Sequence, residues 1–324
     1  MLKSEDPLVS ILMNCFNGEK YLREALDSIL NQNYQNWELI FWDNQSTDNS
    51  AHLFKIYKDP RFKYFLATKH SDLGGGRANA FQYLTGDLIA ILDTDDIWLP
   101  TKLEKQIPLF DDPEVGIVIS DTLFFNKNNE KTLYGKNPPL TGVVFEELLT
   151  SYFVSLETLV MRTSTVMELP RAFDPDFSFI ADFDLVLRCA KISKLAVYKG
   201  VLAKWRVHEA SDSWRLPASF SEEKERWVDK QIKHDIFFSE KYKNEITKIH
   251  DKNNLMIAFS ALLENRRIKA LKFLFKSRFS GWHGLALFIL CFVPLLLKKD
   301  SKFAQFHAKQ GLILLILEVL GFIP

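Results

Sequence analysis

The sequence predicts an α/β fold, with a mostly parallel sheet flanked by helices and a helical C-terminal extension. In the first hundred residues, short apolar runs alternate with amphipathic segments, as in consecutive βαβ units, and turn-forming polar residues follow the runs. A chain of 324 residues is long enough for one large α/β domain with appended elements. Basic and acidic residues balance at 41 each, so we expect no nucleic-acid partner.

The chain begins with a strand, helix, strand, helix pattern. Residues 8–13 form an apolar run after Pro7 and predict a buried strand, and residues 38–42 predict a second one. The intervening helix has apolar residues at helical spacing: Leu22, Ala25, Leu26, Ile29 and Leu30. A second helix ends near Tyr57, and residues 62–66 predict a third strand. Together these segments predict a βαβ unit.

A fourth predicted strand, residues 87–92, runs directly into Asp93, Asp95 and Asp96. Ligands of open α/β sheets bind at the carboxyl ends of the strands. Three carboxylates there repel one another unless a cation joins them, and Mg²⁺ or Mn²⁺ binds carboxylates while leaving positions for substrate phosphates. The cluster indicates a metal-diphosphate site. Taken alone, it is also explained as a solvated acidic turn before the next helix.

The rest of the α/β domain continues the alternation. We expect strands at 115–120, 158–162, 195–198 and 201–207, and helices at 101–110, at 143–151 and from about Asp182. Residues 126–142, which are rich in Asn, Lys, Gly and Pro, predict a loop over the site.

Polar residues also mark the other strand ends. Asn14 follows the first strand, Asp43 the second, and Arg77 lies in a Gly-rich segment after the third. Singly, each has an ordinary explanation: Asp43 caps a helix, Arg77 is a surface cation, and Asp182 favours the positive end of a helix dipole. Together they predict base, phosphate and metal binding at one edge of the sheet.

Four segments of this chain resemble successive blocks of the family 2 glycosyltransferases. They are residues 9–17, 21–32, 43–48 and 92–96, and the resemblance extends over about residues 7 to 210. It implies an inverting enzyme with the Rossmann-like GT-A fold. The order and spacing of several blocks make the resemblance far more specific than the acidic cluster.

The resemblance implies roles for the residues at the strand ends. Asn14 belongs to the first donor-binding block, Phe16 and Asp43 would hold the nucleobase, and Arg77 the base or the diphosphate. Asp93 would face the ribose and Asp95 would bind the metal. The family usually has Tyr where this chain has Phe16, so stacking on a base is kept and a phenolic hydrogen bond is lost.

Two later blocks imply a base and a further ligand. Residues 181–188 are similar to the family pattern Glu-Asp-x-Asp-x-x-x-Arg, with Ala181 in place of Glu and Asp182 in the general-base position. The Arg-x-His segment at 206–208 implies that His208 completes the metal or diphosphate site, a role in which imidazole suits Mn²⁺ better than Mg²⁺.

The predicted function is therefore a metal-dependent inverting glycosyltransferase that uses Mn²⁺ or Mg²⁺. The donor is expected to be a UDP-linked sugar, and the acceptor a glycan or a lipid-linked molecule in cell-surface polysaccharide synthesis. Two alternatives stay open: a non-catalytic, membrane-tethered module that binds nucleotide sugars, and a sugar nucleotidyltransferase. A sugar nucleotidyltransferase is expected to have a Gly-rich phosphate loop after its first strand, and this chain has Asn14, Cys15, Phe16 and Asn17 there instead.

Composition divides the chain into three predicted parts. They are a GT-A domain at 7–215, a helical extension with a basic end at 216–278, and a hydrophobic tail at 279–324. The tail has two strongly apolar stretches with basic residues on both sides of the first, which favours an in-plane or re-entrant helix on the cytoplasmic face of a membrane. A buried helical pair is the alternative. Three widely separated cysteines fit a reducing cytosol.

Overall fold

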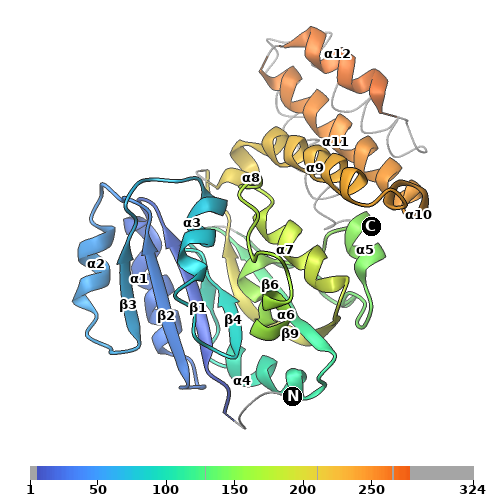
Figure 1. The fold of residues 1–324 in the computed structure, drawn as a ribbon. Coiled ribbons are helices and arrows are strands. Elements are labelled where there is room, and N and C mark those ends of the chain that lie inside the picture. Colours follow the sequence, from blue (N-terminus) through green and yellow to red (C-terminus); the bar gives the residue numbers. More distant parts are fainter. Residues whose placement is uncertain (1–5, 128, 210, 265, 278–324) are drawn as a thin grey trace. The chain divides into compact units, whose positions relative to one another are not determined.

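The computed structural model describes residues 6–127, 129–209, 211–264 and 266–277 (Figure 1). The chain divides into two compact units. The first comprises residues 1–145 and 154–208 and contains the sheet, and the second comprises 146–153 and 209–324. The hydrophobic tail predicted at 279–324 lies outside the described residues.

Within the described residues, the sheet has nine strands in the order β3-β2-β1-β4-β8-β6-β9-β5, with β7 paired to β6. The bounds are β1 Val9–Cys15, β2 Trp37–Asp43, β3 Phe62–Leu66, β4 Leu88–Ile91, β5 Ile97–Trp98, β6 Val115–Phe125, β7 Glu130–Thr132, β8 Val160–Arg162 and β9 Lys194–Arg206. Strands β1 to β4 pair in parallel, as do β6 and β9, whereas β5, β7 and β8 pair antiparallel. The predicted α/β class with a mostly parallel sheet is confirmed.

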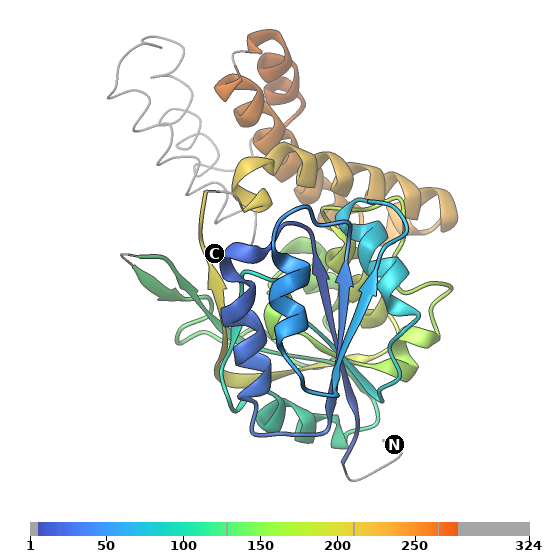
Figure 2. The same cartoon turned by 90° about the vertical axis from the view of Figure 1, so that its left-hand side faces the viewer.

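Helices cover both faces of the parallel strands. The helical segments of the first unit are α1 Glu19–Leu30, α2 Ser50–Ile56, α3 Leu73–Phe81, α4 Lys102–Gln106, η1 Ile107–Asp111, η2 Leu156–Thr158, α6 Thr163–Met167 and α7 Ala181–Ala190. In Figure 2, α1 and α2 lie on one face of the sheet and α3 lies on the other. Two covered faces explain why β1 and β2 are almost entirely buried and mostly apolar.

Three predicted segments differ in the structure. The loop expected at 126–142 contains a short strand, β7, because its backbone pairs with the end of β6. The helix expected at 101–110 is α4 followed by the 3-10 segment η1, because Pro108 lacks the backbone N–H that would continue the α-helical hydrogen bonds. The strands expected at 195–198 and 201–207 are one strand, β9, which pairs with β6 along its length. The register between β6 and β9 shifts on both sides of Asp121, so β9 continues through the point where the sequence suggests a break.

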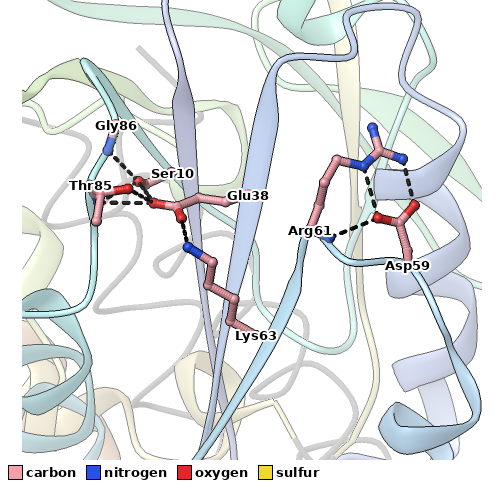
Figure 3. Close-up of polar contacts among 7 residues, drawn as sticks. All are labelled: Ser10, Glu38, Asp59, Arg61, Lys63, Thr85 and Gly86. Carbon is pink, nitrogen blue, oxygen red and sulfur yellow. Dashed lines mark hydrogen bonds and ion pairs between the residues drawn. The ribbon is translucent and has the colours of Figure 1, made fainter.

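A buried carboxylate joins three parallel strands near their amino ends (Figure 3). Glu38 on β2 accepts hydrogen bonds from the Ser10 hydroxyl at 2.5 Å and from the backbone N–H and hydroxyl of Thr85 at 2.9 and 2.8 Å, and it pairs with Lys63 on β3. The Gly86 N–H donates to Ser10 at 2.7 Å. Burial opposes the charge, but the bonds from Lys63, Ser10 and Thr85 outweigh it and lower the pKa of Glu38.

The second unit is helical, as the period of residues 219–278 predicts. Its helices are α5 Phe145–Thr150, which begins at the last residue of the first unit, α8 Asp212–Arg215, α9 Pro217–His234, α10 Phe238–Lys241, α11 Lys243–Leu263 and α12 Arg267–Lys276. Trp227, Phe238 and Phe259 are buried in it. None of the helices described is both long and apolar enough to cross a membrane.

Candidate active site

The first strand end supplies an amide that α3 approaches closely. A Cβ added to Gly76 of α3 would lie 2.7 Å from Oδ1 of Asn14, so only glycine allows this contact without displacing the amide. That oxygen is buried and has no hydrogen-bond partner within the part of the chain that the structure describes. An unsatisfied buried acceptor costs free energy, which a donor group of a bound molecule would recover.

The second strand ends in a buried carboxylate. Asp43 Oδ1 accepts a hydrogen bond from the Ser46 N–H at 2.8 Å, and Oδ2 accepts one from the Tyr64 hydroxyl at 2.6 Å. Burial, followed by this bond and the charge of Asp43, raises the pKa of Tyr64, which keeps the phenol protonated as a donor. Each carboxylate oxygen has a second acceptor site, so the geometry is compatible with the predicted contact to a base.

An aromatic pair lies next to this carboxylate. The ring of Phe16, half of whose surface is exposed, lies 4.2 Å from the ring of His70, centroid to centroid. His70 Nδ1 is 2.9 Å from the carbonyl oxygen of Asn44, and the Asn44 side chain binds Ser71 through Oδ1 and Nδ2. Asn44 N–H also donates to the Cys15 carbonyl at 2.8 Å, which fixes the pair near the ends of β1 and β2.

Arg77 forms an ion pair with Asp93, the first residue of the acidic loop, which comprises residues 93–96. Arg77 Nη2 lies 2.7 and 3.0 Å from the two carboxylate oxygens of Asp93. Desolvation opposes the charge of Arg77, which is 2% exposed, but Asp93, Asp182 and Asp95 raise its pKa. The Asp93 side chain is 31% exposed, whereas the Arg77 side chain that pairs with it is 3% exposed.

Asp95 meets His208 across a separation of 113 residues. Asp95 Oδ2 is 2.8 Å from His208 Nε2, and their side chains are 30% and 17% exposed. No group of three or more His, Cys, Asp or Glu side chains is arranged to hold a metal ion among the residues described. Asp95 and His208 supply one carboxylate and one imidazole, which are donor types that divalent ions such as Mn²⁺ accept.

The third acid of the cluster is buried. Asp96 is 4% exposed, and its Oδ1 accepts a hydrogen bond from the Arg206 N–H at 2.9 Å. Burial, followed by the charges of Asp95 and Glu157, raises the pKa of Asp96 well above its ordinary value. Like charges at close range have this effect, and a cation at Asp95 would relieve it.

The two acids of α7 have different environments. Asp184 is buried and pairs with Arg188 at 2.6 Å, and Arg188 also donates to the carbonyls of Arg171 and Ala172. Asp182 is half-buried at the second position of the helix, and its charge acts on Arg77 and, more weakly, on Asp93. The fold therefore brings Asp182 to the acidic loop and uses Asp184 to anchor the helix.

Residues 10–164 match the family described as "Glycosyl transferase family 2". The first unit is a family 2 glycosyltransferase domain. Its similarity to a curated relative extends further: the chain is 29% identical over 225 residues to the UDP-Glc:alpha-D-GlcNAc-diphosphoundecaprenol beta-1,3-glucosyltransferase WfgD of Escherichia coli. That alignment covers 69% of this chain and 85% of the relative.

Solved structures share the GT-A fold of this family 2 domain. The mannosyltransferase PcManGT from Pyrobaculum calidifontis, in complex with GDP-Man and Mn²⁺, has a TM-score of 0.61 at 16% identity over 98% of this chain and 88% of its own. TarS 1–349 from S. aureus, in complex with UDP, has a TM-score of 0.58 at 17% identity over 95% of this chain and 90% of its own. The predicted GT-A fold is confirmed.

The structure brings the predicted site residues of this family 2 domain to one edge of the sheet. They are Asn14, Phe16, Asp43, Arg77, Asp93, Asp95, Asp182 and His208. Their roles stay predictions. Sequence reasoning missed His70 and Arg206: His70 gives no signal because it is an exposed loop residue, and the Arg-x-His segment marks Arg206 without indicating what it contacts.

Proposed function

We propose that this chain is an inverting, metal-dependent glycosyltransferase that moves a sugar from a UDP-linked donor to a lipid-linked acceptor in cell-surface polysaccharide synthesis. The observation that carries the proposal is the convergence of Asp95 with His208 and of Arg77 with Asp93 and Asp182 in a family 2 domain. The same edge of the sheet thus carries the two side chains that we propose as ligands of a divalent ion, the buried guanidinium of Arg77, and the carboxylate of Asp182 that we propose as the proton acceptor.

The donor is held by the strand ends. Phe16 stacks on the nucleobase while Asp43 accepts a hydrogen bond from it, and Asp93 contacts the ribose. Asp95 and His208 would hold Mn²⁺ or Mg²⁺, which supplies positive charge to the diphosphate leaving group when bound. The diphosphate is then a better leaving group at the anomeric carbon.

Asp182 acts as the general base. The acceptor hydroxyl attacks the anomeric carbon from the face opposite the nucleotide, and its proton passes to the Asp182 carboxylate. A new bond forms between the acceptor oxygen and the anomeric carbon, while the bond from that carbon to the diphosphate oxygen breaks and its electron pair leaves with UDP. The configuration at the anomeric carbon inverts.

Two similarities support the choice of substrates. The name of the E. coli relative gives UDP-Glc as donor and a diphosphoundecaprenol-linked sugar as acceptor, and a TarS structure contains UDP. A lipid-linked acceptor also agrees with the predicted attachment of residues 279–324 to the cytoplasmic face of a membrane. Matches to glycosyltransferases argue against the sugar nucleotidyltransferase alternative.

A donor screen tests the proposal. Thermal shift with a panel of UDP-, GDP- and dTDP-sugars, each with and without Mn²⁺, should give the largest stabilisation with a UDP-sugar and Mn²⁺ together. The best donor is then incubated with a diphosphoundecaprenol-linked sugar and release of UDP is measured. Donor binding without transfer to any lipid-linked or glycan acceptor would favour the non-catalytic binding module instead.

A further inference from the structure

Arg206, the last residue of β9, is enclosed by three parts of the first unit. Its guanidinium carbon lies 4.4 Å from the ring centroid of Tyr21 on α1 and 4.6 Å from that of Phe125 on β6. Nε donates to the backbone carbonyl of Asp95 at 2.9 Å, and Nη2 pairs with Glu24 of α1 at 2.9 Å. The side chain is 13% exposed. Stacking and charge-assisted bonds together fix its position.

The same residue holds the acidic loop at two consecutive positions. Its side chain binds the carbonyl of Asp95, and its backbone N–H donates to the carboxylate of Asp96. A displacement of Arg206 therefore moves the backbone that directly follows the Cα of Asp95. Asp96 is buried, and the Arg206 N–H is the only donor to its carboxylate among the hydrogen bonds that the structure describes.

Arg206 also sets the position of His208, two residues further along the chain. The ring of Tyr21, which stacks on the Arg206 guanidinium, lies 5.1 Å from the ring of His208. Tyr21 on α1 thus contacts both Arg206 and His208, and Asp95 Oδ2 lies 2.8 Å from His208 Nε2.

We propose that Arg206 is a positioning residue that holds Asp95 and His208 in the arrangement that receives the divalent ion. The inference rests on the proposed function for the identity of these two ligands. Its guanidinium is committed to the loop carbonyl, to Glu24 and to two aromatic faces, so it orients ligands rather than binding the diphosphate. Residues one layer outside a metal site act in this way, and their loss typically lowers metal affinity 10- to 100-fold.

Arg61 offers a matched control. Its guanidinium is also stacked on an aromatic ring, 3.7 Å from that of Trp37, and it pairs with Asp59 at 2.6 Å (Figure 3). Among the described residues, its side-chain hydrogen bonds go to Asp59 and Gln35, and none goes to the acidic loop. Arg206→Met and Arg61→Met therefore remove comparable stacks and ion pairs. Only Arg206→Met also removes a hydrogen bond to the acidic loop.

The experiment measures Mn²⁺ binding to the full chain with saturating UDP by isothermal titration calorimetry, and the melting temperature in EDTA. We expect Arg206→Met to weaken Mn²⁺ binding 10- to 100-fold and Arg61→Met to change it less than twofold, while both lower the melting temperature. Arg206→Lys keeps the charge but loses the planar guanidinium that stacks on the two rings and donates in a fixed geometry, so an intermediate loss of about three- to tenfold is expected.

Asp95→Asn separates this inference from the proposed function. If Asp95→Asn lowers Mn²⁺ affinity and both Arg206 variants bind Mn²⁺ as the wild type does, Arg206 is merely structural and the inference is overturned. If Asp95→Asn itself leaves Mn²⁺ affinity unchanged, the proposed metal pair is wrong and the inference falls with it.

Discussion

Lys102 is a fully buried lysine, and we predict that it makes the stability of the protein depend on pH above neutrality. Its Nζ donates to Gln106 Oε1 at 2.7 Å and lies 4.3 Å from the Trp98 ring centroid. Burial lowers the pKa of Lys102 to about 7, although the charge of Glu157 opposes this. The perturbation is Lys102→Met, which fills similar space without a titrating group.

The size of the effect follows from the two pKa values. The native state releases the Lys102 proton near pH 7, whereas the unfolded chain keeps it until about pH 10.4. Because the unfolded state binds more protons across this window, the free energy of unfolding rises with pH. Integration from pH 7 to pH 9 gives a rise of about 2 kcal/mol for this one group.

The assay is urea unfolding of wild type and Lys102→Met at pH 7, 8 and 9. The difference in unfolding free energy, wild type minus variant, should rise by about 2 kcal/mol over this range. Lys105→Met, on the exposed side of the same helix, should leave the difference constant. Parallel pH curves for wild type and Lys102→Met would refute the reasoning.

Three further changes have expected outcomes. Glu38→Gln should lower the free energy of unfolding by about 1–3 kcal/mol at pH 7 and make it less dependent on pH in acid. The lowered pKa of Glu38 stabilises the folded protein above about pH 4.3, the pKa of an unfolded glutamate, and this stabilisation is lost as the pH falls further. Urea unfolding at pH 3 to 7 measures it. Gly76→Ala should displace the Asn14 amide and weaken UDP binding by about fivefold with little change in melting temperature, since alanine favours a helix by about 1 kcal/mol. Calorimetry with UDP tests it. Phe16→Ala should weaken UDP binding by about 5- to 150-fold, as loss of one base stack does, and Phe16→Tyr should not. Equal affinity of Phe16→Ala and wild type would remove Phe16 from the base site.

Local pattern was enough to predict the parallel half of the sheet. Strands β1, β2 and β4 are mostly apolar and end in polar turns, and the helix with Leu22, Ala25, Leu26 and Ile29 buries those residues as its spacing requires. Parallel strands share one carboxyl edge, so Asn14, Asp43 and Asp93 had to lie near one another once the strands were known. No long-range information was needed for this part of the site.

The other contacts depend on pairing between distant segments. The β9 strand lies beside β6 and β5, which no spacing in the sequence encodes, and this pairing alone delivers Arg206 and His208 to the acidic loop.

The most direct test of the account is the rate of sugar transfer by Asp182→Asn. It is measured against wild type with saturating UDP-sugar, Mn²⁺ and lipid-linked acceptor, together with UDP affinity by calorimetry. Loss of the general base should lower kcat by about 10²- to 10⁴-fold while UDP affinity stays within twofold of wild type. A variant that transfers sugar at the wild-type rate would contradict the assignment of Asp182 as the base.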